Sequence, residues 1–364
     1  MKVLALATYP VEAAATRYRL YQFVEPLAER GIQLTVRPFL DSRSFAALYD
    51  RKNLMRTGLC FSQAALRRFG DLFRIASADV LLVQREAAMI GPPLIEWLAA
   101  QVGKRPMVLD LDDATYVSYT SPTYGRLGKS LKWFGKTDDL IRWSKAVTCG
   151  NRVIAEYVVG KGTRARVIPT VVDTDLFQPA MPAHHNSPAV VGWVGTHSTY
   201  PFLKSIFPVL QKLAADYSFR LKVVGAGTDE IRIPDVEVEN LPWSLSRETD
   251  DFRSFDIGLY PIDVSTYRTD WTMGKSCFKA IQYMAVGIPY VVNPIGVCAE
   301  IGEPGVTHLT AVNPDQWYEA LRILLEDREL RRRMGVAGRQ YAVKHYNVSD
   351  QADKLAEVLR EAAA

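Results

Sequence analysis

Residues 274–289, GKSCFKAIQYMAVGIP, have the residue types and spacing to hold an anionic ligand. Lys275, Lys279 and Gln282 would share one side of a helix, while apolar residues at complementary positions would share the other. A glycine and a proline near its end would stop the helix. Its N-terminus would add backbone N–H groups and the positive end of the helix dipole to the charge of Lys275. The segment therefore predicts a site for a nucleotide diphosphate, and a solvated helix face is the alternative.

A hydroxyl-rich turn follows the apolar run at residues 190–194. The turn consists of Gly195, Thr196, His197, Ser198 and Thr199. A helix is expected to begin near Pro201, with Thr199 as its cap and the amides of the turn exposed to phosphate. A capping turn without a ligand is equally consistent with these residues.

Three carboxylates, Asp110, Asp112 and Asp113, come at the end of the strand predicted to begin at Met107. Side chains at the carboxyl end of a strand can bind the hydroxyls of a ligand or a metal ion. An acidic turn that caps the next element is the alternative. The sequence contains no Ser-His-Asp grouping and no cluster of metal ligands, so no metal is expected.

The run Gly225-Ala226-Gly227 is similar to the start of a dinucleotide-binding fingerprint. The third glycine of that fingerprint is replaced by Glu230. An NAD site is therefore not expected there.

The composition is that of an ordinary soluble protein, with 48% hydrophobic and 23% charged residues among 364. No apolar run approaches the roughly 18 residues of a membrane span. Residues 3–8 are too short for a signal peptide and predict a strand. Cys60, Cys149, Cys277 and Cys298 show no metal-ligand or disulfide-framework spacing, so free thiols in the reducing cytoplasm are expected.

Positive charge is concentrated in the first half of the chain. Residues 1–180 carry 25 Lys and Arg against 17 Asp and Glu, and the remainder carries 19 against 23. Residues 125–145 interleave Lys, Arg and Trp, which predicts contact with an anionic membrane surface or with a lipid-phosphate substrate. An ordinary surface helix is the alternative. Nucleic acid is not expected as a partner, because no recognition module is visible.

Strands alternate with helical patterns in both halves, such as the helical stretches at residues 17–30 and 93–102. The first half predicts strands at residues 3–7, 34–38, 80–84, 107–111, 146–149 and 166–168. After a Pro-rich linker at residues 178–188, the second half predicts strands at residues 190–195, 221–224, 236–238, 257–260 and 290–292. This alternation predicts an α/β protein with two doubly wound parallel sheets.

Taken together, these residues resemble the GT-B glycosyltransferases, specifically the retaining family 4 type. The most specific similarities lie in the second half, at residues 190–195, 256–261, 275–289, 296 and 300–301. In the first half, residues 168–173 resemble the family's approach to the interdomain linker. The resemblance covers essentially the whole chain. It implies two Rossmann-like domains facing a cleft, with an acceptor-binding domain at residues 1–180 and a nucleotide-sugar-binding domain at residues 181–347. A final helix within residues 348–364 would return to the first domain.

The resemblance also implies the site residues. The donor would be held by Gly195, Thr196, His197, Ser198, Thr199, Lys275, Ser276, Cys277, Phe278, Lys279 and Gln282. Two family glutamates, eight positions apart, are replaced here by Gly274 and Gln282, and the family histidine after the fourth strand is replaced by Asp112. Lys275 would substitute for an Arg and Lys pair usual in the family. Asp112 would bind a donor-sugar hydroxyl, and Arg17, Arg19 and Arg85 would line the acceptor side.

The implied activity is retaining transfer of a sugar from a UDP- or GDP-type donor to a glycan or lipid-linked acceptor, with no further cofactor. Bacterial polysaccharide or glycolipid assembly, in the cytoplasm or on the inner face of the membrane, is the implied setting. Two alternatives remain. A nucleotide-sugar epimerase would share the architecture, and a non-catalytic sugar-nucleotide-binding or partner protein is favoured by the residues Gly274 and Gln282.

Overall fold

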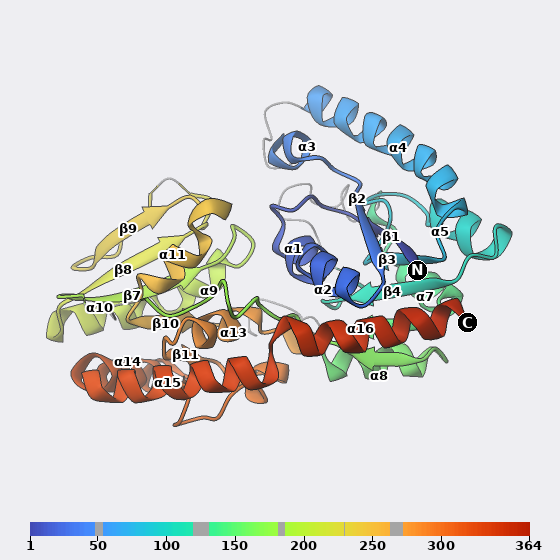
Figure 1. The fold of residues 1–364 in the computed structure, drawn as a ribbon. Coiled ribbons are helices and arrows are strands. Elements are labelled where there is room, and N and C mark those ends of the chain that lie inside the picture. The colour runs from blue at the N-terminus through green and yellow to red at the C-terminus, as the bar shows by residue number, and fades with distance from the viewer. Residues whose placement is uncertain (48–53, 119–130, 181–185, 229, 263–271) are drawn as a thin grey trace. The chain divides into compact units, whose positions relative to one another are not determined.

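The structure is a computed structural model that describes residues 1–47, 54–118, 131–180, 186–228, 230–262 and 272–364. The chain separates into two compact units (Figure 1). The first unit comprises residues 1–171 together with 348–364, and the second comprises residues 172–347. Residues 172–180, assigned to the first domain from the sequence, therefore lie in the second unit.

A six-stranded parallel sheet forms the centre of the first unit, in the order β2-β1-β3-β4-β5-β6. Its strands are β1 Lys2–Ala7, β2 Gln33–Pro38, β3 Val80–Gln84, β4 Met107–Leu111, β5 Ala146–Cys149 and β6 Ala165–Val167. Every residue of β3, β4 and β5 is buried. Apart from Gln84, Asp110 and Thr148 these strands are apolar, which is typical of parallel strands covered by helices on both faces.

Helices follow most of these strands. They are α1 Ala14–Arg19, α2 Val24–Glu29, α3 Ser42–Ala47, α4 Leu54–Ala76, α5 Leu94–Trp97 with the π-helical η2 Leu98–Val102, α7 Lys136–Trp143 and α8 Arg152–Gly160, with η1 Tyr21–Phe23 between α1 and α2. The helical stretch expected at residues 17–30 is thus broken into short pieces, and Pro26 lies in the first turn of α2. A proline is tolerated there because the first-turn N–H groups lack helical partners.

The last helix, α16 Val348–Ala363, belongs to the first unit. It contacts α2, β4 and β5, and is drawn in red in Figure 1. Ala352, Leu355 and Leu359 form part of its buried side. At its margin, Arg30 Nε lies 2.6 Å from Asp353 Oδ1.

The second unit has its own six-stranded parallel sheet, in the order β12-β11-β10-β7-β8-β9. Its strands are β7 Ala189–Val194, β8 Phe219–Val224, β9 Glu237–Leu241, β10 Ile257–Tyr260, β11 Tyr290–Val292 and β12 Leu309–Thr310. The surrounding helices are α9 Tyr200–Ser205, α10 Phe207–Asp216, η3 Leu245–Arg247, α11 Glu248–Arg253, α13 Phe278–Ala285, η4 Gly296–Ala299, α14 Pro314–Glu326 and α15 Arg328–His345. The prediction of two doubly wound α/β sheets is confirmed.

Helix α13 packs closely against α15. A Cβ added at Gly335 would collide with the carbonyl oxygen of Gly287, so the absence of a side chain allows the two backbones to meet. Among the described residues, no helix combines the length and the apolar character that a membrane crossing requires.

Candidate functional site

The order of strands in the second sheet reverses between β7 and β10, although all of these strands are parallel. The chain runs from β7 to β8 and β9 on one side, and then returns to β10 on the other side of β7. Open α/β sheets bind ligands beyond the carboxyl ends of strands at such a switch point. The predicted turn at residues 195–199 follows β7. After β10, residues 263–271 lie outside the described chain, which resumes just before Lys275.

The turn at residues 195–199 is held by its own hydrogen bonds. Thr196 N–H donates to Thr199 Oγ1 at 3.0 Å, and Thr199 N–H donates to the Thr196 carbonyl at 3.0 Å. The hydroxyls of Thr196 and Ser198 are 2.8 Å apart. Thr199 precedes α9, but its side chain makes no bond to that helix, so the predicted cap is wrong. Thr199 stabilises the turn instead, and the amides of Thr196 and Thr199 are already used within it.

The glycines after β8 support this turn. Gly225 and Gly227 have φ angles of 82° and 70°, which favour glycine. A Cβ on Gly225 would lie 2.5 Å from the Gly195 carbonyl oxygen, and one on Gly227 would lie 2.8 Å from His197 Cβ. The sequence motif that resembles a dinucleotide fingerprint therefore serves close packing of two loops at the edge of the sheet.

Lys275 lies against α9, the helix that follows the turn at residues 195–199. Its Nζ is 5.5 Å from the centre of the Phe202 ring in α9, within range of a cation–π interaction. Phe202 itself is buried. The predicted cation and the predicted hydroxyl-rich turn thus lie at the same edge of the second sheet.

The helix predicted from residue 274 begins later than expected. Helix α13 starts at Phe278, because Cys277 before it has a left-handed φ of 49°. Lys275 and Ser276 therefore lie in a loop. The proposed ligand-facing side is also wrong, because Gln282 is fully buried and accepts a 3.0 Å hydrogen bond from Lys279 Nζ.

Lys279 packs among aromatic side chains, with its Nζ 5.4 Å from the centre of the Phe252 ring and 5.9 Å from that of Phe278. Phe278 is buried as well. These contacts place Lys279 and Phe278 in the packing around α13. Because α13 is buried between the sheet and α15, little of its polar side is exposed to a ligand.

Cys277 and Cys298 form a disulfide, with their Cα atoms 5.4 Å apart. The expectation that all four thiols are free is therefore wrong, and Cys277 does not contact the donor through a thiol. The disulfide fastens the start of α13 to η4. Cys60 and Cys149 are free, and burial raises the pKa of Cys149 to about 12.

In the first unit, Arg85 and Asp112 form a bidentate ion pair. Arg85 Nε and Nη2 donate to the two carboxylate oxygens at 2.6 and 2.7 Å. Arg85 follows β3 with a φ of 62°, a strained angle for a residue with a side chain. Burial opposes ionisation of Asp112, but the charge of Arg85 holds its pKa below the usual value. Arg85 was predicted for the acceptor side and Asp112 for the donor sugar, but the two residues form one ion pair.

Arg19 is buried and fully engaged. Its Nε donates to Asp110 Oδ2 at 3.0 Å, a second nitrogen pairs with Asp110 Oδ1, and Nη1 donates to the Ile168 carbonyl at 2.6 Å. Thr148 Oγ1 donates to the same carboxylate at 2.6 Å. The acceptor-side role predicted for Arg19 is therefore wrong. Its charge binds α1 to the ends of β4 and β6.

Arg17 bends back onto the chain, and its Nη1 donates to the carbonyls of Val11 and Glu12 at 2.9 and 3.0 Å. Both carbonyls belong to the segment between β1 and α1. Unlike Arg19, Arg17 is only partly buried. Its predicted acceptor role remains a prediction.

Comparison with known proteins places these features in a recognised fold. The model of the family described as "Glycosyl transferases group 1" matches residues 276–341. The crystal structure of Anabaena HepE in complex with UDP-glucose aligns with a TM-score of 0.70 and 15% identity over 99% of this chain and 100% of that one. This chain has the GT-B fold.

Two further solved structures agree with this GT-B assignment. Sucrose-phosphate synthase from Thermosynechococcus elongatus aligns at a TM-score of 0.66 and 14% identity, covering 99% of this chain and 98% of that one. A glycosyltransferase from Rickettsia africae aligns at 0.67 and 12%, with the same coverage. No match was found among the curated proteins.

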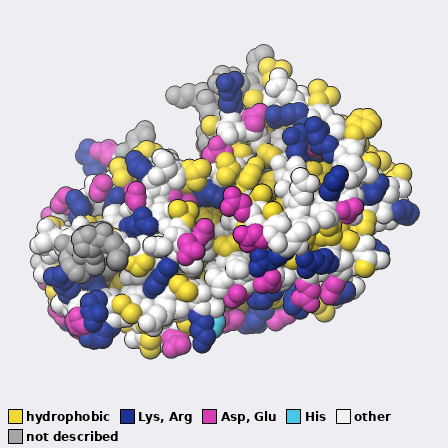
Figure 2. All heavy atoms as spheres, in the orientation of Figure 1, with side chains coloured by type: hydrophobic (Ala, Val, Ile, Leu, Met, Phe, Trp, Pro, Cys, Tyr) yellow, Lys and Arg dark blue, Asp and Glu magenta, His cyan; other side chains and the backbone are white. Residues whose placement is uncertain are grey.

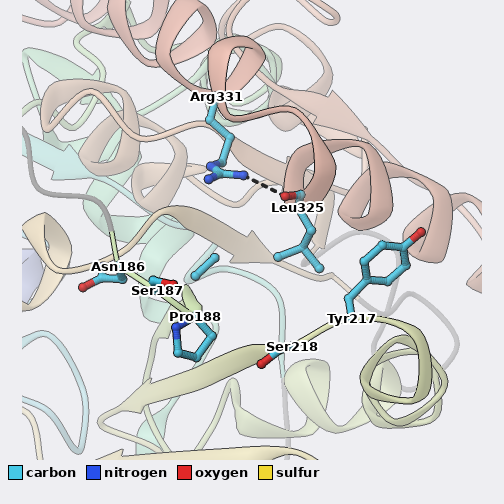
Figure 3. Close-up of a pocket in the computed structure, with 8 residues that line it drawn as sticks. Asn186, Ser187, Pro188, Tyr217, Ser218, Leu325 and Arg331 are labelled. Carbon is cyan, nitrogen blue, oxygen red and sulfur yellow. Dashed lines mark hydrogen bonds between the residues drawn. The ribbon is translucent and has the colours of Figure 1, made fainter.

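One cavity among the described residues lies away from the GT-B switch point. It measures about 430 Å³ and is lined by Asn186, Ser187, Pro188, Ala189, Tyr217, Ser218, Leu325 and Arg331 (Figure 3). Ala189 and Ser218 stand at the amino ends of β7 and β8, opposite the turn at residues 195–199. Figure 3 shows Arg331 directed to the carbonyl of Leu325, from which its Nη1 lies 3.1 Å.

The basic segment predicted to touch a membrane is partly outside the described residues, which resume at residue 131. Its Lys136 is buried, 2.7 Å from Glu86 Oε2, and therefore cannot meet lipid. Trp133 is exposed, whereas Trp143 packs on the core of the first unit. Among the described residues of this GT-B chain, no group of His, Cys, Asp or Glu could hold a metal ion.

Proposed function

We propose that this GT-B protein is a retaining glycosyltransferase that moves a sugar from a UDP- or GDP-sugar to a glycan or lipid-linked acceptor. The observation that carries the proposal is the position of Lys275 against α9, next to the hydroxyl-rich turn at a sheet switch point. A cation beside polar groups at this edge of the sheet suits a diphosphate. The family match beginning at residue 276 and the UDP-glucose complex of HepE support a nucleotide-sugar donor.

In the proposed reaction, an acceptor hydroxyl attacks the anomeric carbon from the face that the nucleotide leaves. The bond from that carbon to the diphosphate oxygen breaks, and the departing oxygen takes the proton of the acceptor. Lys275 would stabilise the negative charge that develops on the diphosphate. The turn at residues 195–199 would position the phosphates, so that most of the catalysis comes from orientation and charge stabilisation.

Asp112 would accept a hydrogen bond from a donor-sugar hydroxyl. Its Oδ1 accepts from Arg85 Nε at 2.6 Å and from Gln84 Nε2 at 3.4 Å, whereas Oδ2 accepts from Arg85 Nη2 and keeps a further lone pair for the sugar hydroxyl. The pair would therefore fix the carboxylate in one orientation. Arg85 would act as a positioning residue for Asp112, rather than as the direct contact to the acceptor that the sequence predicts.

A non-catalytic sugar-nucleotide-binding protein is the second candidate. It is favoured by Gly274, which has no side chain to contact a sugar, and by the buried position of Gln282. Such a protein would bind the nucleotide through Lys275 without turning over its sugar.

Thermal shift with UDP-glucose, UDP-N-acetylglucosamine and GDP-mannose would test the proposal, followed by measurement of nucleoside diphosphate release with and without lipid-linked or glycan acceptors. Binding with release supports the transferase. Binding without any release supports the non-catalytic protein. If none of the panel binds, both candidates are wrong.

A further inference from the structure

Helix α4 exposes an apolar stripe on the side away from the core. The helix is 23 residues long. Leu59, Leu66, Phe69 and Phe73 are exposed by 64%, 73%, 47% and 85%. Their spacing of seven, three and four residues places them on one side of a helix. We call these four residues the α4 stripe.

The opposite side of α4 accounts for its attachment to the first unit. Ala64, Arg68, Asp71 and Ile75 are buried. Arg68 Nη2 donates to the Ala7 carbonyl at 2.8 Å, which links the helix to the end of β1. The helix therefore has its core contacts without the α4 stripe. A single exposed leucine is ordinary, but four large apolar side chains along one helix face indicate a surface that is covered in use.

Positive charge surrounds the stripe. Among the described side chains of residues 41–76, four arginines stand against two carboxylates, those of Asp41 and Asp71. Asp71 alone lies within ion-pair distance of Arg37, Arg68 and Arg74, so one carboxylate is shared by three guanidinium groups. Arg67 Nη1 lies 2.7 Å from Asp41 Oδ2 in an exposed ion pair. The described arginines are therefore partly neutralised, but they still outnumber the two carboxylates. Figure 2 shows hydrophobic side chains beside Lys and Arg along the edge where α4 runs in Figure 1.

The neighbouring helix also exposes apolar side chains. Helix α4 contacts α5 and η2. Leu94 and Trp97 of α5 are exposed, as is Val102 at the end of η2. Tryptophan beside aliphatic and cationic residues is the combination that the headgroup region of a bilayer favours.

We propose that the α4 stripe docks on an anionic lipid bilayer, with the helix lying in the plane of the headgroups. The helix is about 34 Å long, at about 1.5 Å per residue, and can lie along the surface without crossing it. Its apolar side chains enter the boundary of the acyl region while Arg67 and Arg74 contact lipid phosphates. Charge complementarity favours anionic lipid over a neutral surface. The proposal does not depend on the transferase activity, and it replaces residues 125–145 as the principal membrane contact.

Sedimentation with vesicles tests this proposal, using mixed phosphatidylcholine and phosphatidylglycerol vesicles and phosphatidylcholine vesicles alone. The native protein should bind the mixed vesicles, and less tightly at high salt. The variant Leu66→Ser/Phe73→Ser should bind at least about tenfold more weakly, because two apolar side chains no longer leave water. Arg67→Gln/Arg74→Gln should reduce binding by about tenfold or more, because each basic residue near an anionic surface contributes about 1 kcal/mol and about 1.4 kcal/mol corresponds to tenfold.

Val336→Ser/Val343→Ser is the matched control, since these α15 residues are exposed by 48% and 42% in the other unit. It should bind like the native protein. Phe73→Ser alone, at the most exposed position, serves if the double variant is not folded by circular dichroism. Equal binding by native and stripe variants overturns the proposal. So does a concentration-dependent dimer in sedimentation velocity that the stripe variant abolishes, because the occupant would then be a second copy.

Discussion

The carboxyl edges of the two sheets share a topology but differ in chemistry. In the first unit the charged side chains at this edge are paired with one another, as in Arg19 with Asp110 and Arg85 with Asp112. In the second unit the edge carries a self-bonded hydroxyl turn, packed glycines and Lys275 over an aromatic ring. The same fold can therefore present either compensated charges or a cation among polar groups.

This difference suits two kinds of ligand. A compensated ion pair attracts a charged ligand weakly, but it presents oriented hydrogen-bonding groups, which suit hydroxyls. A cation at a sheet switch point attracts a diphosphate. Substitutions at each edge test this division.

Removing one partner of a buried pair in the first unit should cost the most. Arg19→Ala leaves Asp110 buried without its cation, and we expect a loss of about 3–5 kcal/mol in the free energy of unfolding. Urea denaturation measures this loss. Arg164→Ala is the control, because Arg164 pairs with Glu361 on the surface at 2.7 Å and should cost less than about 1 kcal/mol. Similar losses for both variants would show that burial of the charges is not what matters.

Acid should destabilise the second unit before the first. Burial lowers the pKa of His308 to about 4, and the ring stacks on Tyr290 at 4.8 Å. Because the pKa of His308 is lower in the folded protein than in the unfolded chain, protonation of its ring favours unfolding. The contribution of the neutral ring to the free energy of unfolding is therefore complete above about pH 6.5. It falls by about 3 kcal/mol as the pH drops toward 4. The lowered pKa of Asp112 implies that the first unit loses the stability contributed by this carboxylate only below about pH 4.

Hydrogen exchange of peptides from each unit, measured across this pH range, would locate the loss. His308→Gln should remove most of the dependence between pH 6.5 and 4, whereas His345→Gln, at an exposed position, should not. Simultaneous opening of both units near pH 5 would contradict the assignment to His308.

Lys275→Ala should weaken binding of UDP or GDP by about 1.5–3 kcal/mol, the range for a hydrogen bond to a charged group. Isothermal titration calorimetry gives the affinity. Lys212→Ala is the matched control, since Lys212 also lies over a ring, 4.6 Å from the centre of Tyr318. An unchanged affinity for the Lys275 variant would remove this residue from the donor site.

Asp112→Asn keeps the shape of the side chain but removes its charge. We expect about a tenfold loss of turnover, equivalent to ~1.4 kcal/mol, with little change in donor affinity. Steady-state kinetics and calorimetry separate the two quantities. The free energy of unfolding of the same variant shows how much stability is lost when Arg85 has no charged partner. A loss of donor affinity equal to the loss of turnover would place Asp112 in ground-state binding instead.

The positions of most strands could be predicted from the sequence, because buried parallel strands such as β3 and β4 are mostly apolar. The residues at the strand ends could be predicted too. Their partners could not, because Arg19 meets Asp110 across 91 positions of the chain, and only the packing of α1 beside β4 brings them together.

The start of α13 could not be predicted either, because it depends on a contact between residues far apart in the chain. Periodicity continues through residues 274–278, but Cys277 takes a left-handed conformation and is bonded to Cys298, 21 positions away. Local pattern contains no information about such a partner. The same limit applies to Gln282, whose polar character predicted exposure while the packing of the surrounding elements buries it.

The location of α16 in the first unit has a consequence for synthesis on the ribosome. Residues 1–171 emerge first, yet the helix that covers part of β4 and β5 is made only after the whole second unit. Domains generally fold as their chains emerge. Until residues 348–364 leave the ribosome, the surface that receives Leu355 and Leu359 stays uncovered. The unit whose synthesis begins first is therefore completed last.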